Sequence, residues 1–188
     1  MGDGHRASRR WRGAGGGGMV SHAAGGMDQR AGHFRQRPGH PRHRGMSAEA
    51  ALRRTAERYA LGADRRDKTL WREVLADDVE ITGPGFAIVG REANLGSIDH
   101  LAHAFKATRH VVHDQDVTVE GDTARGETRS TAEHRMTGPD GRDLLLVWAI
   151  RYQDCWRREG ESWKFTRRAL IVDWEELRPV GDVGGGAA

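Results

Sequence analysis

The sequence predicts an α+β fold in which helices precede a sheet, and three observations support this expectation. Apolar residues between Leu52 and Ala63 recur at helical spacing, which indicates an amphipathic helix. From His110 onward apolar and polar residues alternate, which is typical of strands with one buried face. Turn sequences at 120–122, 138–141 and 159–161 divide this second half into four long strands. We therefore expect an antiparallel meander with one face covered by helices.

Three helices are expected before the long strands. Ser47 can cap the first, and the charged run 64–67 marks its end. Its apolar stripe consists of Leu52, Ala56, Tyr59 and Ala63. Asp67 can cap a short second helix, whose inward side chains would be Leu70, Trp71, Val74 and Leu75. After a short strand at 79–82, a turn and the segment 86–89, a third helix is expected over 91–105, weakened by Gly96.

The parity of the strands indicates which side chains face inward. The even positions of the strand at 123–136 are mostly small: Ala124, Gly126, Thr128, Ser130, Ala132, His134 and Met136. On the next strand the inward set is bulky: Leu144, Leu146, Trp148, Ile150, Tyr152 and Trp156. Small residues facing bulky aromatic ones can enclose a ligand pocket, and a solid core fits the same pattern.

The first 45 residues differ from the remainder in composition. They hold twelve glycines, nine arginines and five histidines against two aspartates, and they lack the apolar residues needed for a core. We expect a disordered Gly/Arg/His-rich tail over 1–46, a folded domain over 47–178 and a flexible tail over 179–188. The first segment is either an arm that grips nucleic acid or weakly binds a metal, or sequence upstream of a true start at Met46.

Charge follows the same division and argues against two classes of partner. The first 45 residues carry a net +7, and the rest carries −4. Because the part that can fold is mildly acidic, we expect neither nucleic acid nor a membrane as partner. Cys155 is the only cysteine, so an intramolecular disulfide is impossible. Neither a membrane-spanning apolar run nor a secretory signal is apparent, which predicts a cytoplasmic protein.

Metal and nucleotide binding are not expected. His110 and His113 are three residues apart on a strand, so they point to opposite faces. His100 and His103 could share a helix face, but a third ligand at suitable spacing is not evident. The glycines form neither the GxxxxGK nor the strand-linked GxGxxG pattern that binds nucleotide phosphates. We therefore expect no metal and no cofactor.

Three segments of the folded part follow a recognisable order. They read LRRTAERYALGADRRDKTLWREVLADDVEITG, TRHVVHDQDVTVEGDTARGETRS and VWAIRYQDCWRREGESWKFTRRALIVDW. Together they resemble the SnoaL-like branch of the nuclear-transport-factor-2-like superfamily, from about Leu52 to Trp174. The resemblance implies a curved antiparallel sheet that N-terminal helices close into a cone-shaped barrel, a cystatin-like α+β roll around a deep apolar pocket. It also implies a homo-oligomer, either a dimer or a trimer.

The resemblance also implies site residues. Dehydratase-like members share an aspartate at the end of the first helix and a histidine at the start of the first long strand, here Asp64 and His110. Tyr59 matches a pocket tyrosine, and Arg168 falls where some relatives place a substrate-facing arginine. From strand parity, His134 and Trp148 are further candidates for substrate binding.

A histidine oriented by a buried carboxylate suits proton abstraction near neutral pH. The expected function is therefore a cofactor-independent lyase or isomerase, dehydratase- or cyclase-like, acting on a small hydrophobic ring compound. Superfamily relatives also include ligand carriers and small subunits of ring-hydroxylating dioxygenases. A non-catalytic binding or assembly module is thus the alternative.

Overall fold

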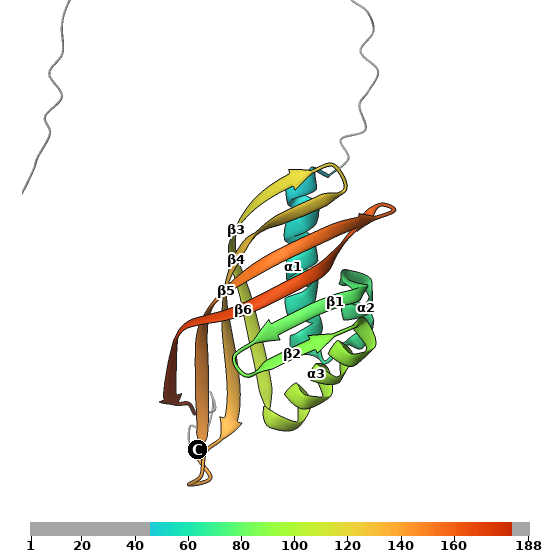
Figure 1. The fold of residues 1–188 in the computed structure, drawn as a ribbon. Coiled ribbons are helices and arrows are strands. Elements are labelled where there is room, and N and C mark those ends of the chain that lie inside the picture. Colours follow the sequence, from blue (N-terminus) through green and yellow to red (C-terminus); the bar gives the residue numbers. More distant parts are fainter. Residues whose placement is uncertain (1–45, 182–188) are drawn as a thin grey trace, which may run out of the picture. The chain divides into compact units, whose positions relative to one another are not determined.

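The computed structural model describes residues 46–181, which form helices on one side of a curved sheet (Figure 1). The predictions for residues 1–45 and 182–188 lie outside the described part. The elements in chain order are α1 (Ala48–Arg65), α2 (Lys68–Val74), β1 (Leu75–Gly83), β2 (Phe86–Val89), α3 (Arg91–Ala104), β3 (Ala107–Glu120), β4 (Thr123–Thr137), β5 (Asp143–Glu159) and β6 (Ser162–Pro179).

Helix α1 begins and ends as its sequence predicts. The Ser47 side chain accepts a hydrogen bond from the Ala50 backbone N–H at 3.2 Å. At the other end Arg66 adopts the left-handed conformation, with φ of 58°. The predicted apolar stripe is buried throughout: Leu52, Ala56, Tyr59 and Ala63. This face contacts β3 and β6, so α1 covers the sheet.

Helix α2 is capped by Asp67, whose side chain accepts from the backbone N–H groups of Thr69 and Leu70. Trp71 and Val74 are buried, as predicted. Leu75 was expected in this helix, but that prediction is wrong. Its backbone is extended, and it is the first residue of β1.

The six strands form one sheet in the order β2-β1-β6-β5-β4-β3. The predicted hairpins β3–β4, β4–β5 and β5–β6 are confirmed. The sheet is not wholly antiparallel, because β1 pairs with β6 in parallel. Register shifts within the β5–β6 pair mark bulges, which bend strands and increase their twist. The long strands accordingly curve around the helical side (Figure 1).

The core lies between the three helices and the sheet. Its largest fully buried apolar side chains are Leu52, Leu75, Val79, Ile98, Trp156 and Phe165. The inward parity predicted for β4 is confirmed, since Ala124, Thr128, Ser130, Ala132 and His134 are all buried. Within residues 46–181, no helix is both long enough and apolar enough to span a membrane.

Candidate active site

A mostly apolar cavity of about 810 Å³ opens between the helices and the inner face of the sheet. Its walls come from all three helices, the β1–β2 hairpin and strands β3 to β6. Trp148 and Tyr152 line the cavity without filling it. Of the two possibilities left open by strand parity, the described residues therefore enclose an open cavity and not a solid core, and its size is usual for small-molecule sites.

Asp64 and His110 meet at the side of this cavity. The end of α1 brings the Asp64 carboxylate against the start of β3, where Oδ1 lies 2.7 Å from Nδ1 of His110. The backbone N–H of His110 donates to Oδ2 of the same carboxylate at 2.8 Å. His110 lines the cavity, and Asp64 lies behind it. Because Nδ1 faces a carboxylate, Nδ1 carries the ring proton and Nε2 is the nitrogen left to accept one.

The carboxylate of Asp64 is held by more than the histidine. Thr108 donates from Oγ1 to Oδ1 at 3.0 Å, and Thr108 itself accepts from Nη1 of Arg66 at 2.7 Å. Burial raises the pKa of Asp64, but hydrogen bonds from His110 and Thr108 outweigh burial and leave that pKa below its ordinary value. Asp64 is therefore ionised at neutral pH and can stabilise an imidazolium at His110.

His134 lies beside the pair on β4. Its ring centroid is 5.7 Å from that of His110, and Phe105 and Trp148 pack on it at 4.6 and 5.0 Å. Burial lowers the pKa of His134 to about 4, with the neighbouring His110 adding to the effect. His134 is thus a neutral imidazole at pH 7, and the Leu146 backbone carbonyl is an acceptor for its single N–H.

Tyr59 lines the cavity from α1 and stacks on Trp71, with ring centroids 4.4 Å apart. Burial raises the pKa of the Tyr59 phenol, so the hydroxyl stays protonated and remains a donor. Tyr59 therefore lies at the cavity wall, and its part in substrate binding stays a prediction.

Arg168, which the resemblance places facing the substrate, lies in the core behind the cavity wall. It is not among the residues that line the cavity, and its side chain is 2% exposed. Its guanidinium forms a bidentate ion pair with Asp154 at 2.8 and 2.9 Å, beneath the rings of Tyr59, Tyr152 and Phe165. Thr128 also donates to Asp154, at 2.8 Å. Both charges of the pair are thus satisfied within the core.

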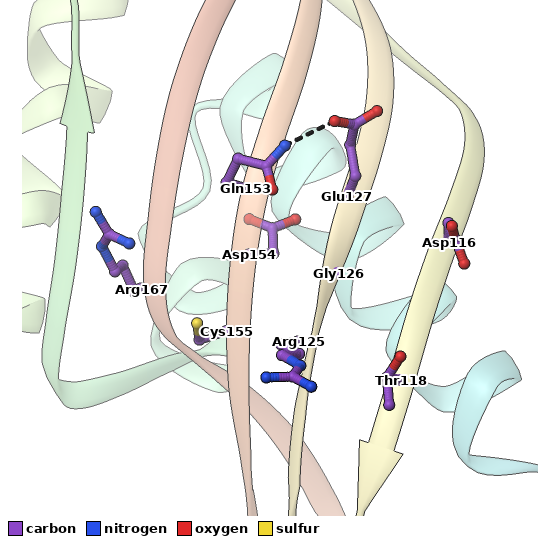
Figure 2. A pocket seen from close by; sticks show the side chains of 9 residues that line it. All are labelled: Asp116, Thr118, Arg125, Gly126, Glu127, Gln153, Asp154, Cys155 and Arg167. Carbon is purple, nitrogen blue, oxygen red and sulfur yellow. Dashed lines mark hydrogen bonds between the residues drawn. The ribbon is translucent and has the colours of Figure 1, made fainter.

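A second, smaller hollow of about 380 Å³ lies on the sheet face away from the helices (Figure 2). Arg125 and Arg167 flank Cys155 there, and the Gln153 side chain donates to Glu127 at 2.6 Å. Its basic and acidic groups are mixed, and it contains no histidine. The apolar cavity is therefore the better candidate for proton abstraction.

Polar cavity residues that the sequence interpretation missed lie mainly on α3: Asn94, Ser97 and His100. Their spacing of three places them on one helix face, a signal available in the sequence once α3 is known to cover a pocket. Among residues 46–181, no group of three or more His, Cys, Asp or Glu side chains is arranged to hold a metal ion.

Residues 44–169 match the model of the SnoaL-like domain. The chain belongs to the SnoaL-like domain family. This family lies within the nuclear-transport-factor-2-like superfamily, in agreement with the helices and the mostly antiparallel curved sheet. A search of curated protein sequences finds no match for this SnoaL-like chain.

Solved structures share the fold of this SnoaL-like domain. A Kribbella flavida protein is 24% identical, with a TM-score of 0.63 over 68% of this chain and 91% of its own. A proposed scytalone dehydratase from Novosphingobium aromaticivorans is 23% identical, with a TM-score of 0.58 over 73% and 93%. Hexachlorocyclohexane dehydrochlorinase LinA-type3 from Novosphingobium barchaimii is 17% identical, with a TM-score of 0.59 over 74% and 94%. At these identities the similarity establishes the fold alone.

Proposed function

We propose that this SnoaL-like domain is a cofactor-independent lyase or isomerase that removes a carbon-bound proton from an uncharged, hydrophobic ring compound. The observation that carries the proposal is the hydrogen-bonded Asp64–His110 pair at the wall of a large apolar cavity. The names of two structural neighbours, a proposed dehydratase and a dehydrochlorinase, describe eliminations of this kind and support it.

In the proposed step, Nε2 of His110 takes a proton from a substrate carbon. The electron pair of the broken C–H bond forms an enolate or a new double bond, and in the second case the leaving group departs with its own bonding pair. The imidazolium then returns its proton to the departing group or to another carbon. Asp64 stabilises the imidazolium, and the Tyr59 hydroxyl can donate a hydrogen bond to a developing oxyanion.

A non-catalytic binding or assembly module is the competing function. Such a module has no use for an ionised carboxylate behind a cavity histidine, whereas a general base gains from one that fixes its tautomer and stabilises its imidazolium. The open cavity beside Trp148 and Tyr152 also provides room for a substrate. The Asp64–His110 pair favours the enzyme over either kind of module, and the cavity favours it over an assembly module alone.

The test uses 2-tetralone, a neutral fused-ring ketone with an acidic C1–H bond, in deuterated buffer. We expect the wild-type protein to accelerate exchange of the C1 hydrogens, as followed by proton NMR. His110→Gln should lower the rate about 10²- to 10⁴-fold, because general-base catalysis contributes roughly that factor. Asp64→Asn should lower it comparably, because the wrong imidazole tautomer is then favoured.

Asp114→Asn is the matched control, since it removes an exposed carboxylate of β3 that pairs with Arg129. It should exchange 2-tetralone at the wild-type rate. All variants should melt within a few degrees of the wild type. A folded His110→Gln protein with an undiminished exchange rate would overturn the proposal.

A further inference from the structure

The α3 wall of the cavity carries a polar side chain that the proposed chemistry does not use. Asn94 lines the cavity and is 1% exposed. Its Nδ2 donates to the backbone carbonyls of Ile88 at 3.1 Å and Gly90 at 2.8 Å. Two carbonyl oxygens can only accept, so the amide nitrogen must face them. The orientation of the amide is therefore fixed by the wall behind it.

The other end of this amide has no protein partner. Oδ1 of Asn94 is buried and lacks a hydrogen-bond partner among residues 46–181. Buried polar atoms are nearly always satisfied, because an unsatisfied acceptor loses its bonds to water without replacement. The two bonds of Nδ2 join β2 to the start of α3, which gives the nitrogen a structural role. The burial of Oδ1 without a partner has no such explanation. A donor on a bound ligand would satisfy it.

The charges around the cavity restrict that ligand further. Of the described residues that line it, none is lysine or arginine. Arg168, the nearby buried cation, is outside this lining and has its charge paired with Asp154 through Nε and Nη2. Glu175 is the single carboxylate of the described lining, and it lies at an exposed position. An anionic ligand would therefore be desolvated without a partner, which disfavours it.

We propose that Asn94 is a substrate-positioning residue whose Oδ1 accepts a hydrogen bond from a hydroxyl or N–H group of an uncharged ring compound. This inference rests on the proposed function and deepens it by naming the chemical class of the substrate. Asn94 orients the ring in the cavity, and the Asp64–His110 pair acts on it.

Asn94 is the sole asparagine of the chain, so a label on asparagine reports on this residue alone. The full-length protein is produced with asparagine carrying ¹³C at the side-chain carbonyl, which gives one signal. 2-Naphthol should move this carbonyl signal downfield, because the hydroxyl donates to Oδ1. 2-Methylnaphthalene has nearly the same size and lacks a donor, so it should bind without that shift. Equal shifts with both bound probes, or none with either, would overturn the proposal.

A substitution tests the same contact by affinity. Equilibrium dialysis measures the affinity for 2-naphthol divided by the affinity for 2-methylnaphthalene. Asn94→Ala should lower this ratio about three- to tenfold relative to the wild type, which is the usual contribution of one hydrogen bond. General damage to the wall would weaken both probes alike and leave the ratio unchanged. Glu92→Gln, on the exposed first turn of α3, should keep the wild-type ratio.

An unchanged ratio in folded Asn94→Ala would refute the role of Asn94. Neither binding measurement requires turnover, so each remains informative if 2-tetralone exchange fails. Exchange that depends on His110, combined with an unchanged probe ratio in Asn94→Ala, would refute the Asn94 inference and leave the proposed function standing.

Discussion

Two of the histidines that line the cavity, His110 and His134, have contrasting surroundings. His110 is anchored through Nδ1 to an ionised carboxylate, whereas His134 is packed between the rings of Phe105 and Trp148. Nδ1 of His134 has no hydrogen-bond partner of ordinary geometry within residues 46–181. The first environment fixes the orientation and tautomer of the His110 ring, and the second favours a ring that stays neutral.

The low pKa of His134 predicts a loss of stability in mild acid. The unfolded chain binds a proton at this residue below about pH 6.5, while the folded protein binds it only near pH 4. The free energy of unfolding should therefore fall as pH drops from 6.5 to 4, by up to about 3 kcal/mol from this residue. Urea midpoints at pH 7 and pH 4.5 measure the difference.

The matched variant for this prediction is His134→Phe, which keeps an aromatic ring in the aromatic cluster and does not titrate. It should retain most of its pH 7 stability at pH 4.5. Equal losses in the variant and the wild type would show that other groups cause the acid sensitivity.

Among the elements, α1 and α2 are joined by one close contact. Trp71 packs over Gly62 and donates from Nε1 to the Tyr59 carbonyl at 2.9 Å. A Cβ added at Gly62 would lie 2.5 Å from Trp71 Cδ1, which is closer than real contacts allow. Gly62→Ala should therefore lower the free energy of unfolding by about 1–3 kcal/mol, as overpacking usually does.

Gly96 of α3 provides the opposite case. A Cβ there would meet no atom within 4 Å, so Gly96→Ala should gain up to about 1 kcal/mol from helix propensity. Thermal melts of the two variants should move in opposite directions from the wild type. A lower melting temperature for both would contradict this account of the two helices.

Strands β5 and β6 are joined by the buried Asp154–Arg168 pair. Arg168→Met leaves an unpaired carboxylate in the core, so it should cost about 3–5 kcal/mol of stability. Arg151 forms a similar bidentate pair with Asp173 on the exposed face, and Arg151→Met should cost much less stability because solvent screens this pair. Denaturant unfolding compares the two, and equal costs would show that burial does not determine the strength of the pair.

Across the whole domain, the predictions that succeeded rest on local signals. The caps at Ser47 and Asp67, the stripe of α1 and the three hairpins each involve residues close in sequence. The parallel pairing of β1 with β6 joins segments about ninety residues apart, and neither strand's alternation identifies its partner. For that reason the sheet was expected to be wholly antiparallel.

The candidate site shows the same division. Resemblance placed Asp64 and His110 together, and the structure brings them into contact because α1 ends beside the start of β3. Arg168 could not be placed by strand parity. Phe165 and Arg168 both face inward, because a bulge between them shifts the register of β6 and reverses the parity. A single asparagine within a helix carries no functional signal in the sequence. The role of Asn94 is indicated by its position in the cavity wall.

The central claim is that Asp64 and His110 act as one catalytic unit, and the exchange rates of a double variant test it most directly. Groups that act together are strongly non-additive, so Asp64→Asn/His110→Gln should exchange 2-tetralone about as slowly as His110→Gln alone. The claim would be contradicted if the double variant were slower than His110→Gln by the full factor that Asp64→Asn causes alone. Equal exchange rates in His110→Gln and the wild type would contradict it as well.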